Sequence, residues 1–241
     1  MNKNLFRSLA LSAALSIASI GAASAGMINF SMNSMGNPTP MNQSLGSVYS
    51  FSGGVTAYAG SLQTWNSTCT DTAPTPCLDY KYTNGDPTET GLGLIPTPSN
   101  EINYPYGIAF TTSSGYIGGF LLGSVQSGES WQVLGCTNGI SPTSCSVLAS
   151  GIGPNTANDT ALVTGLGNFG GYVVDVPCQN NISNCNPGVV PGAPLDPGST
   201  YGGNNILVMS ATTVPEPGTL ALFAAGLLGC LIFVRRRVRQ H

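Results

Sequence analysis

The chain of 241 residues has little charge, because Asp, Glu, Lys and Arg together make up only 7% of it, against about a quarter in an ordinary soluble domain. It has one histidine, His241, at its last position. A Ser-His-Asp or Cys-His site therefore lacks its usual base, and a zinc hydrolase lacks its usual nitrogen ligands. The chain also lacks a P-loop and a dinucleotide-binding glycine fingerprint. These absences argue against most enzyme classes.

Positive charge is nearly missing between residues 26 and 214. Lys81 is the only cation there, whereas the same span holds nine acids, so its net charge is −8. A surface of this sign repels phosphate backbones, and we expect no nucleic-acid partner. It favours solubility and could attract divalent cations.

The first 25 residues have the pattern of a secretory signal peptide. Lys3 and Arg7 precede an apolar run, and Ala23 and Ala25 are the small residues that signal peptidase needs at its cleavage site. The sequence predicts cleavage before Gly26 and export of the mature chain.

Residues 214–241 have the pattern of a second targeting segment. Val214, Pro215, Glu216 and Pro217 are followed by 17 residues without charge, 218–234. As a helix these would span about 25 Å, a little less than the ~30 Å hydrocarbon core, so we predict one transmembrane helix. The two prolines cannot continue that helix backward, which favours an extended, accessible peptide at the membrane surface. The positive-inside rule places the C-terminal end, 235–241, in the cytoplasm, because it carries Arg235, Arg236, Arg237 and Arg239.

The order and spacing of these features resemble the PEP-CTERM sorting tail, which joins a Pro-Glu-Pro motif, a short transmembrane helix and a terminal arginine cluster. The resemblance covers about 214–239 and implies recognition by exosortase, a membrane-embedded enzyme of bacteria that make extracellular polysaccharide. It implies that the motif is read, that the helix is removed, and that the body is released or attached at the surface. An unprocessed single-pass anchor is the alternative, but it leaves Pro-Glu-Pro unexplained. The tail is also catalogued as an ice-binding protein C-terminal domain.

Six cysteines of the exported region form three close pairs along the chain, while Cys230 lies inside the predicted transmembrane helix. Six cysteines allow many pairings, but the intervals are rich in Pro, Asn, Ser and Thr and favour local bridges. An oxidising compartment permits them. The absence of Cys-x-x-Cys and of nearby histidine argues against a metal site. We predict the disulfides Cys69–Cys77, Cys136–Cys145 and Cys178–Cys185.

The region between the two targeting segments is predicted to be all-β, a β-sandwich or jelly roll. In it, short runs rich in β-branched and aromatic residues alternate with turn residues. Residues 78–83 alternate clearly and predict a half-exposed strand. Residues 206–209 are continuously apolar and predict a central strand. Residues 26–43 are polar and predict a loose arm. The predicted strands are 47–51, 55–58, 78–83, 106–112, 116–122, 130–135, 146–149, 161–164, 171–176 and 206–211.

One polar cluster has oxygen ligands that Ca²⁺ prefers, namely Asp86, Glu89, Asn100 and Glu101. No EF-hand spacing is present, so a turn feeding a strand is the favoured interpretation, with Gly91 and Gly93 allowing close backbone approach. The segment from Glu89 to Gly93 resembles a Glu-x-Gly-Leu-Gly sequence that recurs in bodies carrying the same tail. We therefore predict no cofactor, with Ca²⁺ as the one alternative.

Aromatic residues offer a further interpretation. Trp65 and Trp131, with several tyrosines, could stack on sugar rings, although core packing is the favoured role for Trp131 and exposure for Trp65. A two-carboxylate glycosidase needs only two acids at the right separation, and nine acids give no reason to choose a pair.

These observations predict a signal peptide at 1–25, a secreted β-sandwich domain at 26–213 and a sorting tail at 214–241. We expect a non-catalytic surface or extracellular-matrix protein, associated with exopolysaccharide or biofilm. Its precursor would be anchored transiently in the inner membrane, with signal peptidase, exosortase and extracellular polysaccharide as partners. The alternatives are a carbohydrate- or ice-surface-binding module and a polysaccharide-active hydrolase.

Overall fold

The computed structural model describes residues 26–61, 64–65, 69, 75–95, 97, 100–103, 106–113, 115–127, 129–141, 144–153, 159–177, 205–215 and 226. Gly26–Thr213 form one compact unit, which is called the body below. The predicted signal peptide and the Cys178–Cys185 pair lie outside the described residues, as do Glu216, Pro217 and the arginines. Of the predicted transmembrane helix only Gly226 is described, and within the described part of the chain no helix is long and apolar enough to cross a membrane.

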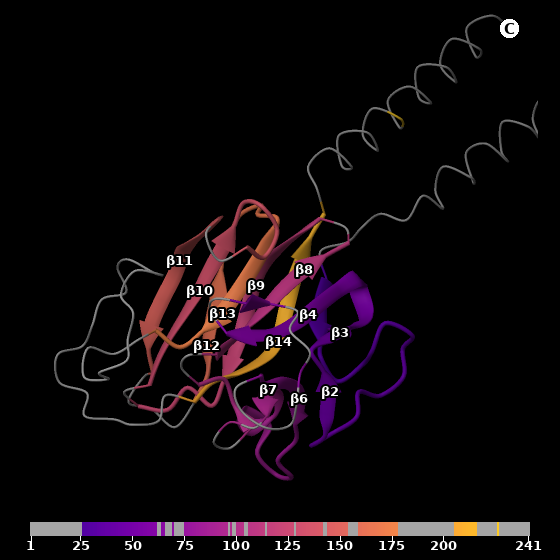
Figure 1. The fold of residues 1–241 in the computed structure, drawn as a ribbon, viewed down its shortest axis with the longest axis vertical. Coiled ribbons are helices and arrows are strands. Elements are labelled where there is room, and N and C mark those ends of the chain that lie inside the picture. The colour runs from indigo at the N-terminus through magenta and orange to yellow at the C-terminus, as the bar shows by residue number, and fades with distance from the viewer. Residues whose placement is uncertain are drawn as a thin grey trace, which may run out of the picture. The chain divides into compact units, whose positions relative to one another are not determined.

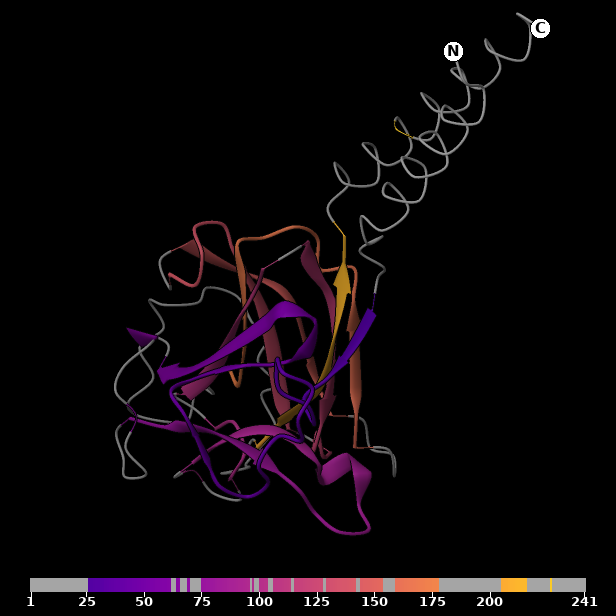
Figure 2. The ribbon, with the colours of Figure 1, turned by 90° about the vertical axis from the view of Figure 1, so that its right-hand side faces the viewer.

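The body is all-β and built from two antiparallel sheets, as predicted, which Figures 1 and 2 show from perpendicular directions. The first sheet has the order β12-β9-β14-β7-β6-β2, and β1 also pairs with β14. Its strands are β1 Gly26–Asn29, β2 Ser44–Gly46, β6 Cys77–Lys81, β7 Gly91–Ile95, β9 Tyr116–Gly123, β12 Ala161–Thr164 and β14 Leu207–Val214.

The second sheet has the order β11-β10-β13-β8-β4-β3, and β5 also pairs with β4. In Figure 1 its strands β11, β10 and β13 lie side by side, in agreement with their registers. Its strands are β3 Val48–Ser50, β4 Val55–Ser61, β5 Thr64–Trp65, β8 Tyr106–Thr112, β10 Ser130–Cys136, β11 Cys145–Ile152 and β13 Gly171–Asp175. Two short 3₁₀ helices, η1 Ser52–Gly54 and η2 Pro87–Glu89, connect strands.

Every predicted strand overlaps an observed one, and β8 and β12 have the predicted bounds. The prediction of a central strand at 206–209 is confirmed, because β14 lies between β9 and β7. Sequence analysis missed β1, β2 and β5, and treated β7 as part of a polar cluster. β1 and β7 both contain glycine and few β-branched residues, so their local propensity for strand is weak.

The two sheets pack face to face over one hydrophobic core. Leu78, Leu92 and Phe120 of the first sheet share it with Phe110 and Tyr172 of the second. The aromatic rings form a continuous series through this core: Phe110 lies 5.0 Å from Phe120 between ring centroids, and Phe120 lies 6.3 Å from Tyr172. Such offset and edge contacts stabilise aromatic pairs beyond their burial.

The prediction of a loose arm at 26–43 is wrong. β1 pairs with β14, and Ile28 and Phe30 alternate into the core, where Phe30 is 0% exposed and stacks 5.7 Å from Phe110. The Asn33 side chain accepts hydrogen bonds from the backbone of Met35 and Asn37, which closes the polar turn that follows. The segment is polar in composition because most of it is turn, while its two apolar anchors suffice to fix it.

Two of the three predicted disulfides are present in the described residues, Cys69–Cys77 and Cys136–Cys145. Cys136 and Cys145 stand opposite each other in the β10–β11 register. They border a second, smaller cluster that contains Ala109, Leu134 and Val173. The bridge therefore fixes the β10–β11 hairpin at the edge of the second sheet.

We expect Phe30→Ala to lower the free energy of unfolding of the full chain by about 3–5 kcal/mol, because it opens a cavity between the two sheets. Met35→Ala, four-fifths exposed in the same segment, should change it by less than about 0.5 kcal/mol. Chemical denaturation measures both, and equal small effects would contradict the packing of the segment into the core.

Candidate functional site

Lys81, the only cation of the body, lies between two glutamates. It is the last residue of β6, and its Nζ donates to Oε2 of Glu89 at 2.6 Å and also contacts Oε1 of Glu101. The side chains of Lys81, Glu89 and Glu101 are 15%, 19% and 4% exposed. These three residues are called the Lys81 triad below. Its charges are largely withdrawn from water, so each must find its partner inside the protein.

The 3₁₀ helix η2 positions Glu89. Asp86 caps it by accepting hydrogen bonds from the backbone N of Thr88 at 3.0 Å and its Oγ1 at 2.7 Å, and Pro87 begins the helix. Glu89 is the last residue of η2, and its Oε1 accepts from Ser124 Oγ at 2.8 Å. One carboxylate oxygen therefore faces Lys81 while the other is held by Ser124.

A turn that is hydrogen-bonded to the residue just before β14 positions Glu101. Ile102, 0% exposed, exchanges backbone hydrogen bonds with Ile206 at 2.8 and 3.1 Å. The Thr97 hydroxyl donates within the same turn to the carbonyl oxygen of Glu101, 2.5 Å away. The backbone on both sides of Glu101 is thus anchored, which orients its carboxyl group toward β6.

The glycines of the Glu-x-Gly-Leu-Gly segment make this close packing possible. A Cβ on Gly93 would overlap the carbonyl oxygen of Asn100, and one on Gly91 would stand 3.0 Å from the carbonyl oxygen of Val208. Between them, Leu92 points into the core. The interpretation of this segment as a turn feeding a strand with close backbone approach agrees with η2 and β7.

The two carboxyl groups of the triad have opposite pKa shifts. Burial raises the pKa of Glu101 to about 7, against the lowering effect of Lys81. Burial also acts to raise the pKa of Glu89, but hydrogen bonds from Lys81 and Ser124 outweigh it and lower the pKa. Desolvation opposes the charge of Lys81, yet hydrogen bonds to both glutamates keep its pKa above the ordinary value. The favoured charge state is a Lys81–Glu89 ion pair beside a Glu101 that holds its proton up to about neutral pH.

The prediction that residues 78–83 form a half-exposed strand is wrong. Asp79, on the face that alternation assigns to solvent, is 0% exposed, and its register partner is Gly93, against which Asn100 packs. Burial raises the pKa of Asp79 to about 6, and neither of its carboxylate oxygens has a hydrogen-bond partner. The turn that carries Glu101 therefore covers the outer face of β6, which alternation within β6 alone could not reveal.

The four Ca²⁺ candidates do not share one ligand position. Glu89 and Glu101 meet at the Lys81 ammonium, Asp86 caps η2, and Asn100 lies beside Asp79. Within the described ranges, no group of three His, Cys, Asp or Glu side chains is arranged to hold a metal ion. Calcium binding stays a prediction that no observation tests.

A second buried acid lies in the other sheet. Asp175 is 0% exposed, stands opposite Gln132 in the β10–β13 register, and has no hydrogen-bond partner for either carboxylate oxygen. Oε1 of Gln132 also has none. Burial raises the pKa of Asp175 to about 7. Asp175 is thus a carboxyl group that the folded state prefers to keep neutral.

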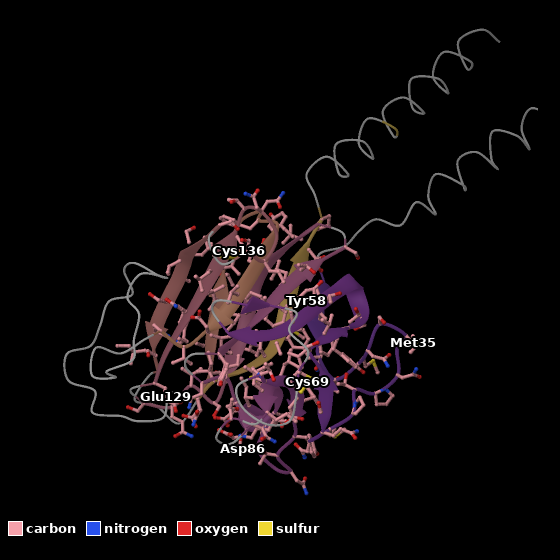
Figure 3. The ribbon with its side chains drawn as sticks, in the orientation of Figure 1. Met35, Tyr58, Cys69, Asp86, Glu129 and Cys136 are labelled. Carbon is pink, nitrogen blue, oxygen red and sulfur yellow. A yellow bond between two sulfur atoms is a disulfide. The ribbon has the colours of Figure 1, made fainter. Side chains whose placement is uncertain are left out.

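An open pocket of about 460 Å³ lies beside η2 and β1. Its lining includes Met27, Tyr82, Asp86, Leu121 and Met209. Tyr82 is 44% exposed, and Asp86 lies toward the lower end of the body in Figure 3, far from Cys136. Of the two predicted stacking tryptophans, Trp131 is half-buried and packs its ring over Gly151 against the core, and the Trp65 side chain lies outside the described residues.

Both predicted processing points meet at one end of the first sheet. Gly26, the predicted mature N-terminus, pairs with Thr213, whose Oγ1 donates to the Gly26 carbonyl oxygen at 3.3 Å. β14 runs on to Val214, and Pro215 ends it because proline lacks the N–H that a ladder requires. The predicted motif thus begins where the last strand of the body stops.

Comparison with known proteins identifies one feature. The PEP-CTERM protein-sorting motif matches residues 213–237. No curated protein and no solved structure matches the chain. The fold and the motif together define an all-β protein that carries a signal for sorting by exosortase, as the resemblance implied.

Sequence reasoning missed the role of Lys81. The sequence did contain a signal for this role. The body has one cation and nine acids, so Lys81 is its only positive side chain that can neutralise a buried carboxylate. Which acids it meets depends on η2 and the 100–103 turn, which the local sequence does not place.

We expect Asp175→Asn to stabilise the full chain at pH 8 by roughly 1–3 kcal/mol. Because the folded state binds a proton at Asp175 up to about pH 7 while the unfolded chain releases it near 3.8, the stabilisation from that proton is full below pH 3.8 and is lost as pH rises through 7. The advantage of the variant should therefore vanish near pH 4.

Denaturant titrations at pH 4, 6 and 8 measure this. Asp86→Asn serves as the control, since Asp86 is exposed and its pKa is lowered by hydrogen bonds from Thr88. Parallel pH profiles for wild type and Asp175→Asn would show that Asp175 is not the group responsible.

Proposed function

We propose that the chain is a non-catalytic exported protein of the cell surface or extracellular matrix, associated with exopolysaccharide or biofilm. The PEP-CTERM motif at 213–237 is the observation that carries this proposal. In the proposed order, signal peptidase removes residues 1–25, the helix at 218–234 holds the precursor in the inner membrane, and exosortase reads Pro215, Glu216 and Pro217.

The body supports export. Its disulfides Cys69–Cys77 and Cys136–Cys145 suit an oxidising compartment, where small loop-rich domains gain stability from local bridges. Its ends also suit processing: Gly26 and Thr213 are paired, so an intact body remains after removal of the residues beyond each. The motif then follows directly at the end of β14, a central strand of the first sheet.

The environments of five acidic side chains support the proposal that the body has no catalytic activity. Glu89 and Glu101 are joined by Lys81, Glu129 accepts from the backbone N of Gln126 at 2.7 Å, and Asp79 and Asp175 are fully buried. A two-carboxylate glycosidase needs both carboxyl groups open to the sugar, on opposite sides of the scissile bond. These five acids do not offer such a pair.

The C-terminus of the mature protein tests the sorting proposal. Mass spectrometry of the protein from its native host should show a chain that ends near Pro215–Pro217. Replacing Glu216 by Ala should leave an uncleaved, membrane-associated precursor, because the peptide that exosortase reads is changed. Thr212→Ala, exposed and just outside the motif, should be processed like the wild type. A wild-type chain that keeps residues 218–241 would contradict the proposal.

The pocket beside η2 supports carbohydrate binding as a second candidate. Tyr82 offers an exposed ring, and the apolar Leu121 and Met209 surround it with hydrogen-bonding groups of η2 nearby. Such a mixture of a stacking ring with a few polar groups suits a sugar.

Glycan-array binding of the full chain measures this, and we expect Tyr82→Ala to weaken any binding about five- to tenfold, since a lost stacking contact is worth about 1–1.5 kcal/mol. Leu162→Ala, on exposed β12 outside the pocket, is the matched control. Equal binding by Tyr82→Ala and wild type would exclude this pocket.

A further inference from the structure

We propose that Lys81 and Glu101 form an intramolecular amide cross-link, with Glu89 as the proton carrier. The cross-link would join the end of β6 to the turn at 100–103 and is independent of the sorting proposal. The Lys81 Nζ is in contact with the Glu101 carboxyl group and lies 2.6 Å from Glu89 Oε2, so nucleophile, electrophile and base already stand together.

Burial gives the reaction a driving force. An ion pair withdrawn from water loses hydration that its mutual attraction repays only in part. Glu101 is 4% exposed, and the other two side chains are less than one-fifth exposed. Converting ammonium and carboxyl groups into an amide removes charge from this poorly hydrated site. In water the same condensation is opposed by hydration of the separated ions, which this site has already lost.

The two glutamates are suited to different roles. Glu101 is the more buried, and its raised pKa keeps it as the neutral acid that a nucleophile can attack. Glu89 is held by Ser124 and is ionised, so it can take up the proton that Lys81 loses. The lowered pKa of Glu89 and the raised pKa of Lys81 make this transfer uphill, and the condensation that follows must complete it. Two neighbouring carboxyl groups whose pKa values are pushed apart are the usual arrangement for an acid and a base in one site.

The step balances in atoms and charge. Glu89 takes a proton from the Lys81 ammonium, and the free amine attacks Cδ of Glu101, forming the Nζ–Cδ bond. The Cδ–OH bond of Glu101 then breaks, and the hydroxyl leaves as water with a proton relayed from Nζ through Glu89. The site starts as Lys81⁺, Glu89⁻ and neutral Glu101, and ends as a neutral amide and a protonated Glu89. No oxidant, metal or activated donor is consumed.

Positioning supplies the rate. Groups held in contact in a fixed orientation react with effective molarities of about 10⁵ M or more. Here η2 capped by Asp86 fixes Glu89, and the backbone bonds of Ile102 with Ile206 fix the turn of Glu101. Gly93 allows that turn to approach β7 closely enough for the contact. The cross-link would close the β6–β7 region covalently, which suits a body that works outside the cell.

The sequence makes a sharp test available, because Lys81 is the only Lys or Arg between residues 26 and 214. Trypsin and Lys-C do not cleave after an acylated lysine. The full chain should be denatured, reduced, alkylated and digested. We expect the body to survive as one fragment, whereas a free Lys81 would let the protease split it between Lys81 and Tyr82.

A chymotryptic digest then locates the bond. We expect a branched peptide that joins Lys81 to Glu101 and is lighter than its two component peptides by one water. Glu-C cleavage after Glu101 should be lost together with tryptic cleavage after Lys81. Complete tryptic cleavage of the wild type at Lys81 would overturn the proposal, leaving an ordinary ion pair.

Variants assign the roles. Glu101→Ala should restore cleavage after Lys81, and persistent resistance in this denatured variant would overturn Glu101 as the acceptor. Glu89→Gln should also restore cleavage. Where its two disulfides and far-ultraviolet β signal match the wild type, resistance in Glu89→Gln would overturn its role as proton carrier. Leu162→Ala, 72% exposed on β12 and outside the Lys81 triad, is the control, and its cross-link should remain.

Discussion

The burial of one lysine between two glutamates fixes the part of the body where several segments meet. Lys81 ends β6, Glu89 ends η2, and Glu101 lies in a turn that is bonded to the residue before β14. Removing water from these charges costs free energy that only mutual contact recovers. The three segments must therefore keep their relative positions, and in a body with a single cation no second lysine or arginine can replace Lys81. Among the other described acids, Asp86 is exposed and Glu129 accepts from the backbone N of Gln126, whereas Asp79 and Asp175 are buried with raised pKa values.

The glycine-rich segment from Glu89 to Gly93 makes this close arrangement of segments possible. The carboxylate at its start holds the triad, Leu92 fills the core, and the two glycines leave room for the carbonyl oxygens of Val208 and Asn100. A side chain at Gly93 would push away the turn that carries Glu101, and one at Gly91 would press against β14. The segment thus combines core packing, close backbone contact and electrostatics within five residues, which gives a physical reason for each of its residue types.

The ends of the body are organised by a different interaction, the pairing of β1 with β14. Because the first and last strands are register partners, the points beyond which residues are predicted to be removed lie together on one sheet. Phe30 secures the first strand by packing between the sheets near Phe51 and Phe110. The sorting motif therefore follows a strand that is bonded to its neighbours on both sides.

Local patterns were enough to predict the sorting signal, the all-β class, strands that overlap observed ones and the pairing of two disulfides, because each depends on neighbouring residues: apolar runs, turn residues and short cysteine spacing. Long-range packing is the reason that Asp79 is buried, that the polar segment at 26–43 joins the core, and that Glu89 and Glu101 share Lys81. These outcomes depend on which strands are neighbours. β14 lies between β9 and β7, and β6 is covered by a turn some twenty residues further along the chain. Alternation within one strand specifies two faces, but the segment that covers each face is chosen by long-range packing.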